Sequence, residues 1–316
     1  MKVSVCITTL NEEKCIGKLL ESLINQTKRP SEIVITDAGS IDGTIEIIRR
    51  FQKKYRIMKL LVEKGISRAK GRNLSVEIAK NDIIAMTDAG CVAKKNWLKN
   101  LVQPFNNPEV DIVAGFYNMT GATFVQKAFS VFLGTEPSKF DHNFLPSTRS
   151  AAFRKNGWTK VGGFPENLKV TAEDTVFNYE ALKNDLRIVR MKNARVDWEM
   201  PKTFKEFFEK VLNYAKGDVK SGIWFHPTKG LLSHNTKAAI VFFRYLIGLY
   251  LFILGFMSPI YFIILLILFS IYIIWAFRKV RIRTGNNFSS FYGILVQFIS
   301  DLAVILGFIS GILNSK

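Results

Sequence analysis

The segments EIVITDAG (residues 32–39) and DIIAMTDAG (residues 82–90) decide the fold of this 316-residue chain. Both end in TDAG, but SIDGTIEII follows the first copy and CVAKKNWL follows the second. An internal repeat would carry its flanks with it, so the two copies are interpreted as two separate buried strands, each ending in an aspartate. Ligands bind at the carboxyl ends of the strands in an open parallel sheet. The pattern therefore predicts that Asp37 and Asp88 serve one site.

Strand and helix patterns alternate through the first two thirds of the chain. The apolar strand segments are continuous rather than alternating, which is typical of a parallel sheet covered by helices on both faces. The predicted class is therefore α/β. Strands are expected at residues 3–7, 32–36, 57–63, 82–87, 110–116 and 186–191, and helices follow most of them.

The overall composition restricts the function classes. Lys and Arg exceed Asp and Glu by 18, which favours anionic partners such as phosphates or a membrane face. The charges are dispersed and accompany no stacking-aromatic motif or zinc knuckle, so a nucleic-acid binder or a non-catalytic scaffold is disfavoured. The 3 Cys and 3 His form no metal-ligand spacing, and the Cys usage fits a reducing compartment. The N-terminus lacks the apolar region of a signal peptide.

The last third of the chain indicates a membrane protein. Residues 238–257, 259–277 and 291–313 form three predicted transmembrane helices, each long enough to cross a hydrocarbon core of ~30 Å. Residues 201–237, before them, are basic and amphipathic and are predicted to form a juxtamembrane helix at the interface. The expected domains are thus a catalytic domain over residues 1–200, the juxtamembrane segment, and a transmembrane region over residues 238–313.

Charge predicts the orientation. The loop RKVRIRTG after the second span is strongly basic, and such loops stay in the cytoplasm. A multi-pass protein of the cell membrane is therefore expected, with a cytoplasmic catalytic domain and, after the third span, an external C-terminus. Arg244 and Asp301 lie inside spans, where ionisable groups usually face a partner. One option is that they pair with each other.

Three acidic segments could carry chemistry. Asp37, in DAGSIDGT, could accept hydrogen bonds from a nucleobase or ribose, although turns of this composition are common without any function. No GxGxxG follows the first strand, so a dinucleotide is disfavoured. Asp88 could hold Mg²⁺ or Mn²⁺ together with substrate phosphates. Glu173 and Asp174 open a helix, where they could stabilise the helix dipole or supply a general base.

Six motifs in order resemble the family 2 glycosyltransferases of the GT-A fold: TTLNEE, DAGSIDGT, KGISRAKGRN, TDAGC, VGGFPENL and AED. Each motif alone is weak, but the ordered set is specific and covers Val3 to Asp218. Within that family the chain looks most similar to membrane-anchored transferases of polysaccharides and lipid-linked oligosaccharides. The expected architecture is thus a GT-A, Rossmann-like and mostly parallel sheet with flanking helices, followed by the transmembrane region.

The resemblance implies a role for each matching residue. Asp174 matches the catalytic base, with Glu173 beside it, and Asp88 matches the first Asp of the DxD metal motif. Gly90 replaces the second Asp, so one ligand for Mn²⁺ or Mg²⁺ is lost and strict metal dependence is in doubt. The remaining implied residues bind the nucleotide or, for the two lysines, the diphosphate or acceptor: Thr9, Asn11, Glu12, Asp37, Arg72, Asn73, Lys210 and Lys216.

The resemblance also implies a reaction. An inverting transfer would move a sugar from a UDP or GDP sugar to a hydroxyl of a lipid-linked or polysaccharide acceptor. The alternative is a polyprenyl-phosphate glycosyltransferase of the dolichyl-phosphate sugar synthase type. That acceptor is already an anion and needs no proton removed, so the AED element favours a hydroxyl acceptor.

Overall fold

The computed structural model describes residues 1–168, 171–225 and 234–313, which form two compact units. The first unit comprises residues 1–119 and 137–199, and the second comprises residues 120–136 and the chain from residue 200 onward. The backbone therefore passes from one unit to the other three times.

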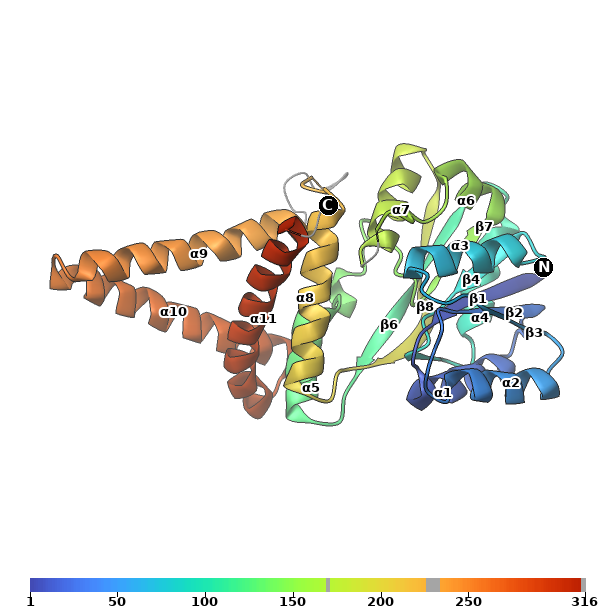
Figure 1. The fold of residues 1–316 in the computed structure, drawn as a ribbon, viewed down its shortest axis with the longest axis horizontal. Coiled ribbons are helices and arrows are strands. Elements are labelled where there is room, and N and C mark those ends of the chain that lie inside the picture. The colour runs from blue at the N-terminus through green and yellow to red at the C-terminus, as the bar shows by residue number, and fades with distance from the viewer. Residues whose placement is uncertain (169–170, 226–233, 314–316) are drawn as a thin grey trace. The chain divides into compact units, whose positions relative to one another are not determined.

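An eight-stranded mixed sheet forms the centre of the first unit (Figure 1). The strand order is β3-β2-β1-β4-β7-β6-β8-β5. The first four of these pair in parallel, whereas β7 is antiparallel to β4 and to β6, and β5 is antiparallel to β8. The strands are β1 (Val3–Thr9), β2 (Glu32–Asp37), β3 (Met58–Val62), β4 (Ile83–Met86), β5 (Cys91–Ala93), β6 (Ile112–Thr120), β7 (Ala151–Arg154) and β8 (Ile188–Glu199).

Helices cover this sheet, and the amphipathic ones bury their apolar faces against it. In α1 (Glu13–Ile24) the buried positions Ile16, Leu19, Leu20 and Leu23 follow helical spacing. All six residues of β2 are buried, as a strand packed on both faces requires. The other helical elements of the unit are α2 (Thr44–Lys54), α3 (Arg68–Ile78), α4 (Trp97–Val102), η1 (Gln103–Asn106), η2 (Pro137–Lys139), α6 (Lys155–Val161) and α7 (Glu173–Lys183).

The predicted α/β class and GT-A-like sheet are confirmed, but the strand pattern missed two short strands. β5 has three residues and β7 has four, and β7 ends in Arg154 and closely follows Arg149, so neither stands out as an apolar run. Both are antiparallel to their neighbours. The second half of the sheet is therefore not the continuation of a parallel array, and this difference positions one residue of the site described below.

The second unit is helical and contains α5 (Phe124–Leu133), α8 (Phe204–Lys220), α9 (His234–Gly255), α10 (Pro259–Thr284) and α11 (Asn287–Leu313). Within the described residues, three helices are long and apolar enough to cross a membrane: Asn235–Gly255, Pro259–Thr284 and Asn287–Leu313. Helix α8 lies within the expected juxtamembrane segment, residues 201–237, whose place at the interface stays a prediction. Residues 226–233 of that segment lie outside the described residues. The suggested pairing is present, with Arg244 Nη2 2.6 Å from Asp301 Oδ2.

Candidate active site

The carboxyl ends of the parallel strands bring Asp37 and Asp88 to the same edge of the sheet. β1 and β2 are in register from Ser4 and Glu32 to Thr9 and Asp37, and β1 also pairs in parallel with β4, which ends two residues before Asp88. The two TDAG copies therefore lie at the carboxyl ends of β2 and β4, on the same edge of the sheet, as their sequence predicts.

Asp37 is fully buried and its carboxylate shapes its own loop. It accepts hydrogen bonds from the Gly39 amide (2.9 Å), the Ser40 amide (2.7 Å) and the Ser40 hydroxyl (2.6 Å). Gly39 has φ +97°, and a Cβ there would lie 3.0 Å from the Lys64 side chain, so the turn favours glycine. The structure thus shows Asp37 stabilising the turn, and its contact with a nucleoside stays a prediction.

The loop after β1 is fastened to the loop after β2. Asn11, in the left-handed region at φ +54°, accepts a hydrogen bond from the Ile41 amide (2.9 Å), and its own amide donates to the Ser40 hydroxyl (2.8 Å). The Glu12 amide donates to the Thr44 hydroxyl (2.8 Å). Thr9 is buried at the end of β1. Asn11 and Glu12 therefore lie in a cross-linked pair of loops beside Asp37, and Thr9 lies at the end of the strand that precedes them.

Helix α3 carries two buried polar residues with different partners. Asn73 pins the loop around Phe164: its amide donates to the Phe164 carbonyl (2.9 Å) and to Glu166 (2.8 Å), and its oxygen accepts from the Phe164 amide (2.9 Å). Gly71 lets this helix approach β1, since a Cβ there would lie 2.6 Å from the Thr8 side chain. Glycine at this position thus has a packing reason.

Arg72 is the centre of the site. Its buried guanidinium binds two carboxylates that are far apart in the sequence, donating to Asp88 Oδ1 (2.9 Å) and to Glu173. Burial opposes ionisation of Asp88, but the guanidinium of Arg72, with those of Arg149 and Arg68, lowers the pKa of Asp88 below its ordinary value. Asp88 is therefore held as an anion at neutral pH.

The acidic pair at the start of α7 is divided by its environment. Glu173 is buried and bound to Arg72, whereas the described residues give the half-buried Asp174 no ion-pair partner. Burial, together with the negative charge of Glu173, raises the pKa of Asp174 above that of an ordinary aspartate. Ala172, immediately before the pair, has φ +80°, a conformation that residues with a Cβ rarely adopt and that is frequent at functional sites. Of the two, Asp174 has the properties of a proton acceptor.

Arg149 belongs to the site and was missed by the sequence interpretation. β7 runs antiparallel to β4, with Ala151 opposite Met86. In an antiparallel pair the partner numbers run in opposite directions, so two places beyond this pair Asp88 is level with Arg149. This register sets Arg149 opposite Asp88. Its guanidinium lies over the Trp198 ring, 3.8 Å from the centroid. Its positive charge contributes to the lowered pKa of Asp88 and offsets part of the rise in the pKa of Asp174. Only knowledge that β7 is antiparallel would have located it.

A metal site at this edge would use few protein ligands. The described residues contain no cluster of three or more His, Cys, Asp or Glu side chains that could hold a metal ion. Asp88 offers the carboxylate oxygen that Arg72 does not engage, and Gly90 offers no side chain. Mg²⁺ and Mn²⁺ are often held by one or two carboxylates plus substrate phosphates and water, so the donor set fits a site completed by a diphosphate.

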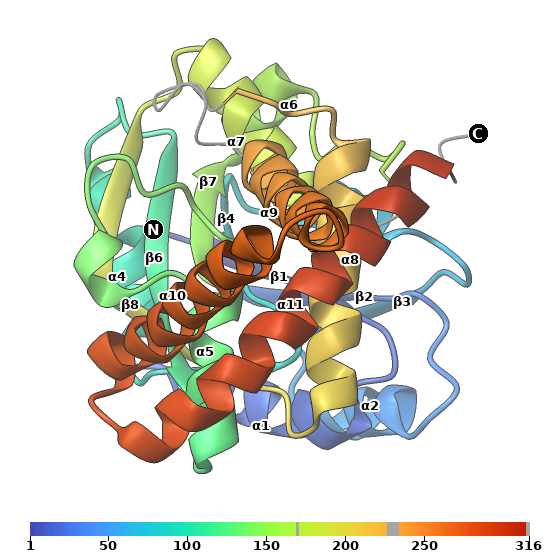
Figure 2. The same ribbon diagram turned by 90° about the vertical axis from the view of Figure 1, so that its left-hand side faces the viewer.

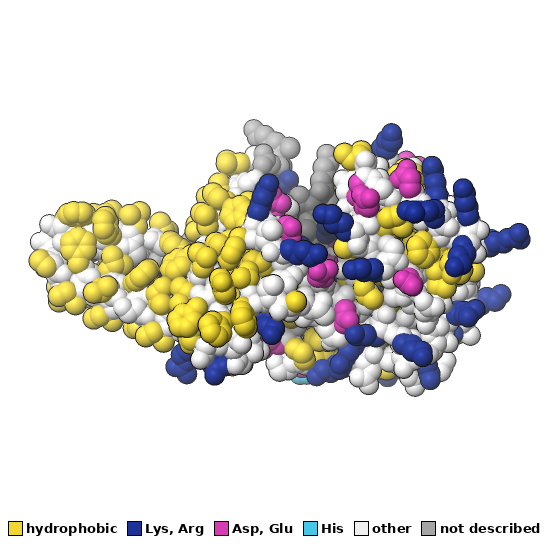
Figure 3. Space-filling view, turned by 90° about the horizontal axis from the view of Figure 1, so that it is seen from below, with side chains coloured by type: hydrophobic (Ala, Val, Ile, Leu, Met, Phe, Trp, Pro, Cys, Tyr) yellow, Lys and Arg dark blue, Asp and Glu magenta, His cyan; other side chains and the backbone are white. Residues whose placement is uncertain are grey.

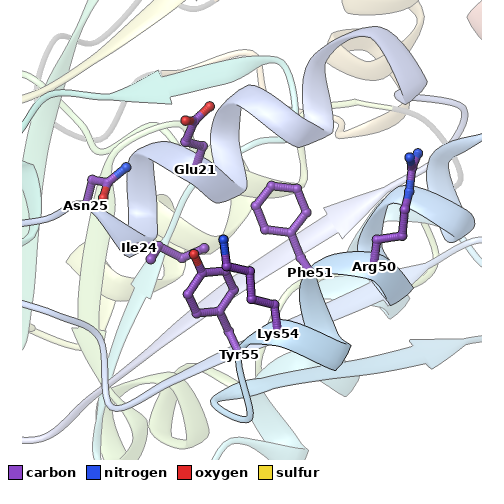
Figure 4. A pocket seen from close by; sticks show the side chains of 7 residues that line it. All are labelled: Glu21, Ile24, Asn25, Arg50, Phe51, Lys54 and Tyr55. Atoms are coloured by element: carbon purple, nitrogen blue, oxygen red, sulfur yellow. The ribbon is translucent and has the colours of Figure 1, made fainter.

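Two predicted diphosphate or acceptor residues and one cavity belong to other elements of the chain. Lys210 and Lys216 are on α8 in the second unit, and their role at the diphosphate or acceptor stays a prediction. A cavity of about 350 Å³ lies between the C-terminal parts of α1 and α2 (Figure 4). Both helices begin at the carboxyl edge of the sheet, so their C-terminal parts lie toward the opposite edge. The lining residues are Glu21, Ile24, Asn25, Arg50, Phe51, Lys54 and Tyr55.

Comparisons with known proteins agree with this arrangement. Two family models match the chain, Glycosyl transferase family 2 over residues 4–157 and Glycosyl transferase family group 2 over residues 83–277. Glycosyltransferase AglE of Haloferax volcanii is 26% identical over 230 residues, which cover 70% of this chain and 74% of AglE.

A second relative is named for a lipid-linked sugar. The dolichyl N-acetyl-alpha-D-glucosaminyl phosphate 3-beta-D-2,3-diacetamido-2,3-dideoxy-beta-D-glucuronosyltransferase of Methanococcus voltae is 24% identical over 256 residues, 71% of this chain and 77% of the relative. Among solved structures, the mannosyltransferase PcManGT from Pyrobaculum calidifontis, in complex with GDP-Man and Mn²⁺, is similar with a TM-score of 0.56 and 20% identity. That match covers 70% of this chain and 62% of PcManGT, and at this identity it shows the fold alone.

Proposed function

Because the chain belongs to the family 2 glycosyltransferases, which use nucleotide-sugar donors, we propose that it transfers a sugar with inversion from a UDP or GDP sugar to a hydroxyl of a lipid-linked or polysaccharide acceptor. The observation that carries this proposal is the divided acidic pair. Glu173 is neutralised by Arg72, whereas Asp174 has a raised pKa and no ion-pair partner among the described residues. A carboxylate in this state suits the removal of a proton from a hydroxyl.

In the proposed reaction Asp174 accepts the proton of the acceptor hydroxyl while the oxygen forms a bond to the anomeric carbon. The bond between that carbon and the diphosphate breaks, and the nucleoside diphosphate departs with the electron pair. Arg149, opposite Asp88, faces the developing negative charge, and Asp88 would hold Mn²⁺ or Mg²⁺. When bound there, such an ion supplies positive charge to the leaving diphosphate. Arg72 holds Asp88 and Glu173 in place.

The acceptor and the location complete the proposal. The name of the Methanococcus voltae relative describes a dolichyl-linked sugar, and three helices of this chain are long and apolar enough to cross a membrane. We place the catalytic unit on the cytoplasmic face, since the basic loop after α10 favours that side. The alternative, transfer to a plain polyprenyl phosphate, would need no base at Asp174.

The test uses the purified full-length chain in detergent. A thermal-shift screen of UDP, GDP and other nucleoside diphosphates, with and without Mn²⁺, should identify one diphosphate that stabilises the protein. Ligand at ~100 times its Kd adds about 2.7 kcal/mol. Transfer from the corresponding sugar is then compared for a lipid-linked sugar and for plain polyprenyl phosphate. Product from the polyprenyl phosphate alone would replace the proposed acceptor by the alternative.

Gly90→Asp is expected to tighten Mn²⁺ binding in the presence of the nucleoside diphosphate by about tenfold, because it adds a second carboxylate to the metal site. The backbone at Gly90 does not have a positive φ, and a Cβ added there would meet no atom within 4 Å, so the substitution fits without strain. Titration of Mn²⁺ measures the effect. Gly90→Asn is the matched uncharged control, and equal affinity in the two variants would contradict the assignment of Asp88 to a metal.

Arg149→Met is expected to lower the transfer rate about 10²–10³-fold, the usual cost of removing one charge-stabilising donor. The methionine keeps an apolar contact with Trp198 but loses the positive charge opposite Asp88. Steady-state kinetics with the identified donor measure the loss. Arg56→Met, at an exposed position between α2 and β3, should leave the rate unchanged. A wild-type rate for Arg149→Met would remove Arg149 from the site.

A further inference from the structure

The three long apolar helices of the second unit differ in how they are covered. In the most apolar window of each, 11% of the α9 residues and 6% of the α10 residues are buried, against 39% in α11. In α10 the consecutive residues Leu266, Ile267, Leu268 and Phe269 are all exposed, so apolar side chains surround this helix. Figure 3 shows hydrophobic side chains over this part of the molecule on the face that it presents. A helix that is apolar on all sides suits a lipid environment on all sides.

Helix α11 has two different faces. Most of its large exposed residues recur at steps of three, four or seven positions, which places them on one apolar stripe: Phe288, Phe291, Leu295, Leu302, Leu306, Ile309 and Leu313, with Tyr292 and Ile312 at its margins. Its buried face is instead made of small and polar residues, which include Ser289, Gly293, Gln297, Asp301, Gly307 and Gly311. One face of α11 is therefore available to lipid and the other is packed against protein.

Over the C-terminal half of α11 the protein on that packed side is α8, a helix whose charges disfavour entry into a bilayer. A Cβ at Gly307 would lie 2.5 Å from the Leu212 carbonyl oxygen, and a Cβ at Gly311 would collide with Val219, so the two helices touch closely along this stretch. α8 carries seven charged residues in 17: Lys205, Glu206, Glu209, Lys210, Lys216, Asp218 and Lys220. If α11 crossed the membrane, its neighbour would be drawn into the hydrocarbon with those charges, which is unfavourable.

Helix α11 also runs across the α9–α10 hairpin rather than alongside it (Figures 1 and 2). α9 and α10 meet at Ser258 and separate toward their other ends, and α11 extends between those ends. If α11 crossed the bilayer together with this hairpin, it would be expected to pack roughly alongside α9 or α10. A hairpin that crosses and a third helix that lies in the membrane plane fit this arrangement better.

A polar cluster joins the middle of α11 to the hairpin. Asp301 accepts hydrogen bonds from Tyr245 (3.1 Å), Tyr272 and Gln297 (2.9 Å), and Arg244 pairs with it. Along α10, Pro259 and Tyr272 are 13 residues apart, or ~20 Å. If α11 lies ~5–10 Å inside the cytoplasmic hydrocarbon boundary, this depth and the ~20 Å from Tyr272 to Pro259 together approach the ~30 Å thickness of the hydrocarbon core.

We propose that only α9 and α10 cross the membrane, and that α11 lies in the plane of the cytoplasmic leaflet with its apolar stripe against the acyl chains and α8 behind it. The stripe is an interaction surface for the lipid bilayer. The C-terminal end of α11 is then on the same side as the catalytic unit, in contrast to the three crossings and external C-terminus that hydropathy alone predicts.

The test measures the depth of side chains along α11. Phe291→Cys, Leu302→Cys and Ile309→Cys, all on the exposed stripe, are labelled with a fluorophore in the full chain reconstituted in liposomes. Lipids with nitroxides at defined depths quench each label. Residues 291 and 309 are ~27 Å apart along the helix. The three α11 labels are expected at one depth, and a spread of ~20 Å or more would overturn the proposal.

The matched controls are Ile260→Cys, Ile267→Cys and Ile274→Cys on α10, which should report a steady change in depth over ~21 Å. Background labelling is limited by Cys15→Ser. Cys6 and Cys91 are buried, and burial raises the pKa of the Cys6 thiol to about 12, which keeps it unreactive.

A second measurement reports the side of each end. An epitope at the C-terminus should be accessible in sealed vesicles whose outer face carries the catalytic unit, whereas an epitope inserted after Met257 should be protected. Protection of the C-terminal epitope would restore a third crossing. Access to both epitopes would show that the hairpin does not cross, and would equally overturn the proposal.

Discussion

Asp174→Asn is expected to lower the transfer rate about 10²–10⁴-fold, the usual contribution of a general base, while leaving nucleoside-diphosphate affinity nearly unchanged. The asparagine keeps the size of the side chain and an oxygen for the Thr175 amide, which donates to Asp174 Oδ1 at 2.9 Å. It cannot accept the hydroxyl proton. Steady-state kinetics and a binding titration on the same preparation separate the two effects.

The same variant has a second expected outcome, in stability. The pKa of Asp174 is raised in the folded protein, so its ionised form is disfavoured by folding at neutral pH. This loss in the free energy of unfolding is absent below the pKa that Asp174 has in the unfolded chain. It appears as the pH rises through the higher pKa of Asp174 in the folded protein. Asp174→Asn should therefore raise the melting temperature at pH 7. A residue retained only to cap α7 would instead lose stability on replacement.

The raised pKa also predicts the pH profile of transfer. The base must be deprotonated, so the rate should fall as pH decreases through the pKa of Asp174. That acidic limb should lie above the ordinary aspartate range. Glu180→Gln, at a half-buried position of the same helix that pairs with Lys183, is the control and should keep both rate and profile. A near-wild-type rate for Asp174→Asn would remove Asp174 from the chemistry.

Arg72→Ala is expected to lower the free energy of unfolding of the catalytic unit by roughly 3–5 kcal/mol, since it leaves the buried Glu173 carboxylate without its counter-charge. At ~2–4 °C per kcal/mol for a domain of this size, the melting temperature should fall by ~6–20 °C. Thermal unfolding of the purified chain measures the shift. The physical reason is desolvation: Arg72 is 3% exposed and Glu173 is 2% exposed, so water cannot replace the lost partner.

Arg68→Ala is the matched control for that loss. Arg68 is on the same helix and also faces Glu173, but at 3.8 Å and with a side chain 52% exposed, so its removal should cost no more than ~1 kcal/mol. The double variant Arg72→Met with Glu173→Gln should be more stable than Arg72→Met alone, because the uncompensated charge is gone. Equal losses for Arg68→Ala and Arg72→Ala would show that burial of the pair is not what stabilises it.

The sequence determined the α/β class, the order of the acidic motifs and the apolar helices, because these depend on local periodicity and run length. It also set Asp37 and Asp88 on one edge, since the carboxyl ends of parallel strands share an edge. The roles it assigned to individual side chains were less complete. It grouped Arg72 and Asn73 as neighbours in one pocket, but Arg72 binds Asp88 and Glu173, whereas Asn73 holds the loop at Phe164.

Only the tertiary structure decided the partners. The antiparallel pairing of β7 with β4 brings Arg149 opposite Asp88, although 60 residues separate them in the sequence. Contact with Arg72 distinguishes Glu173 from Asp174, which are adjacent and similar in any local pattern. Packing against α8 distinguishes α11 from two other helices of similar hydropathy. The physical reason is the same in each case: a charge or an apolar face acquires its role from the group it meets, and that group comes from a distant part of the chain.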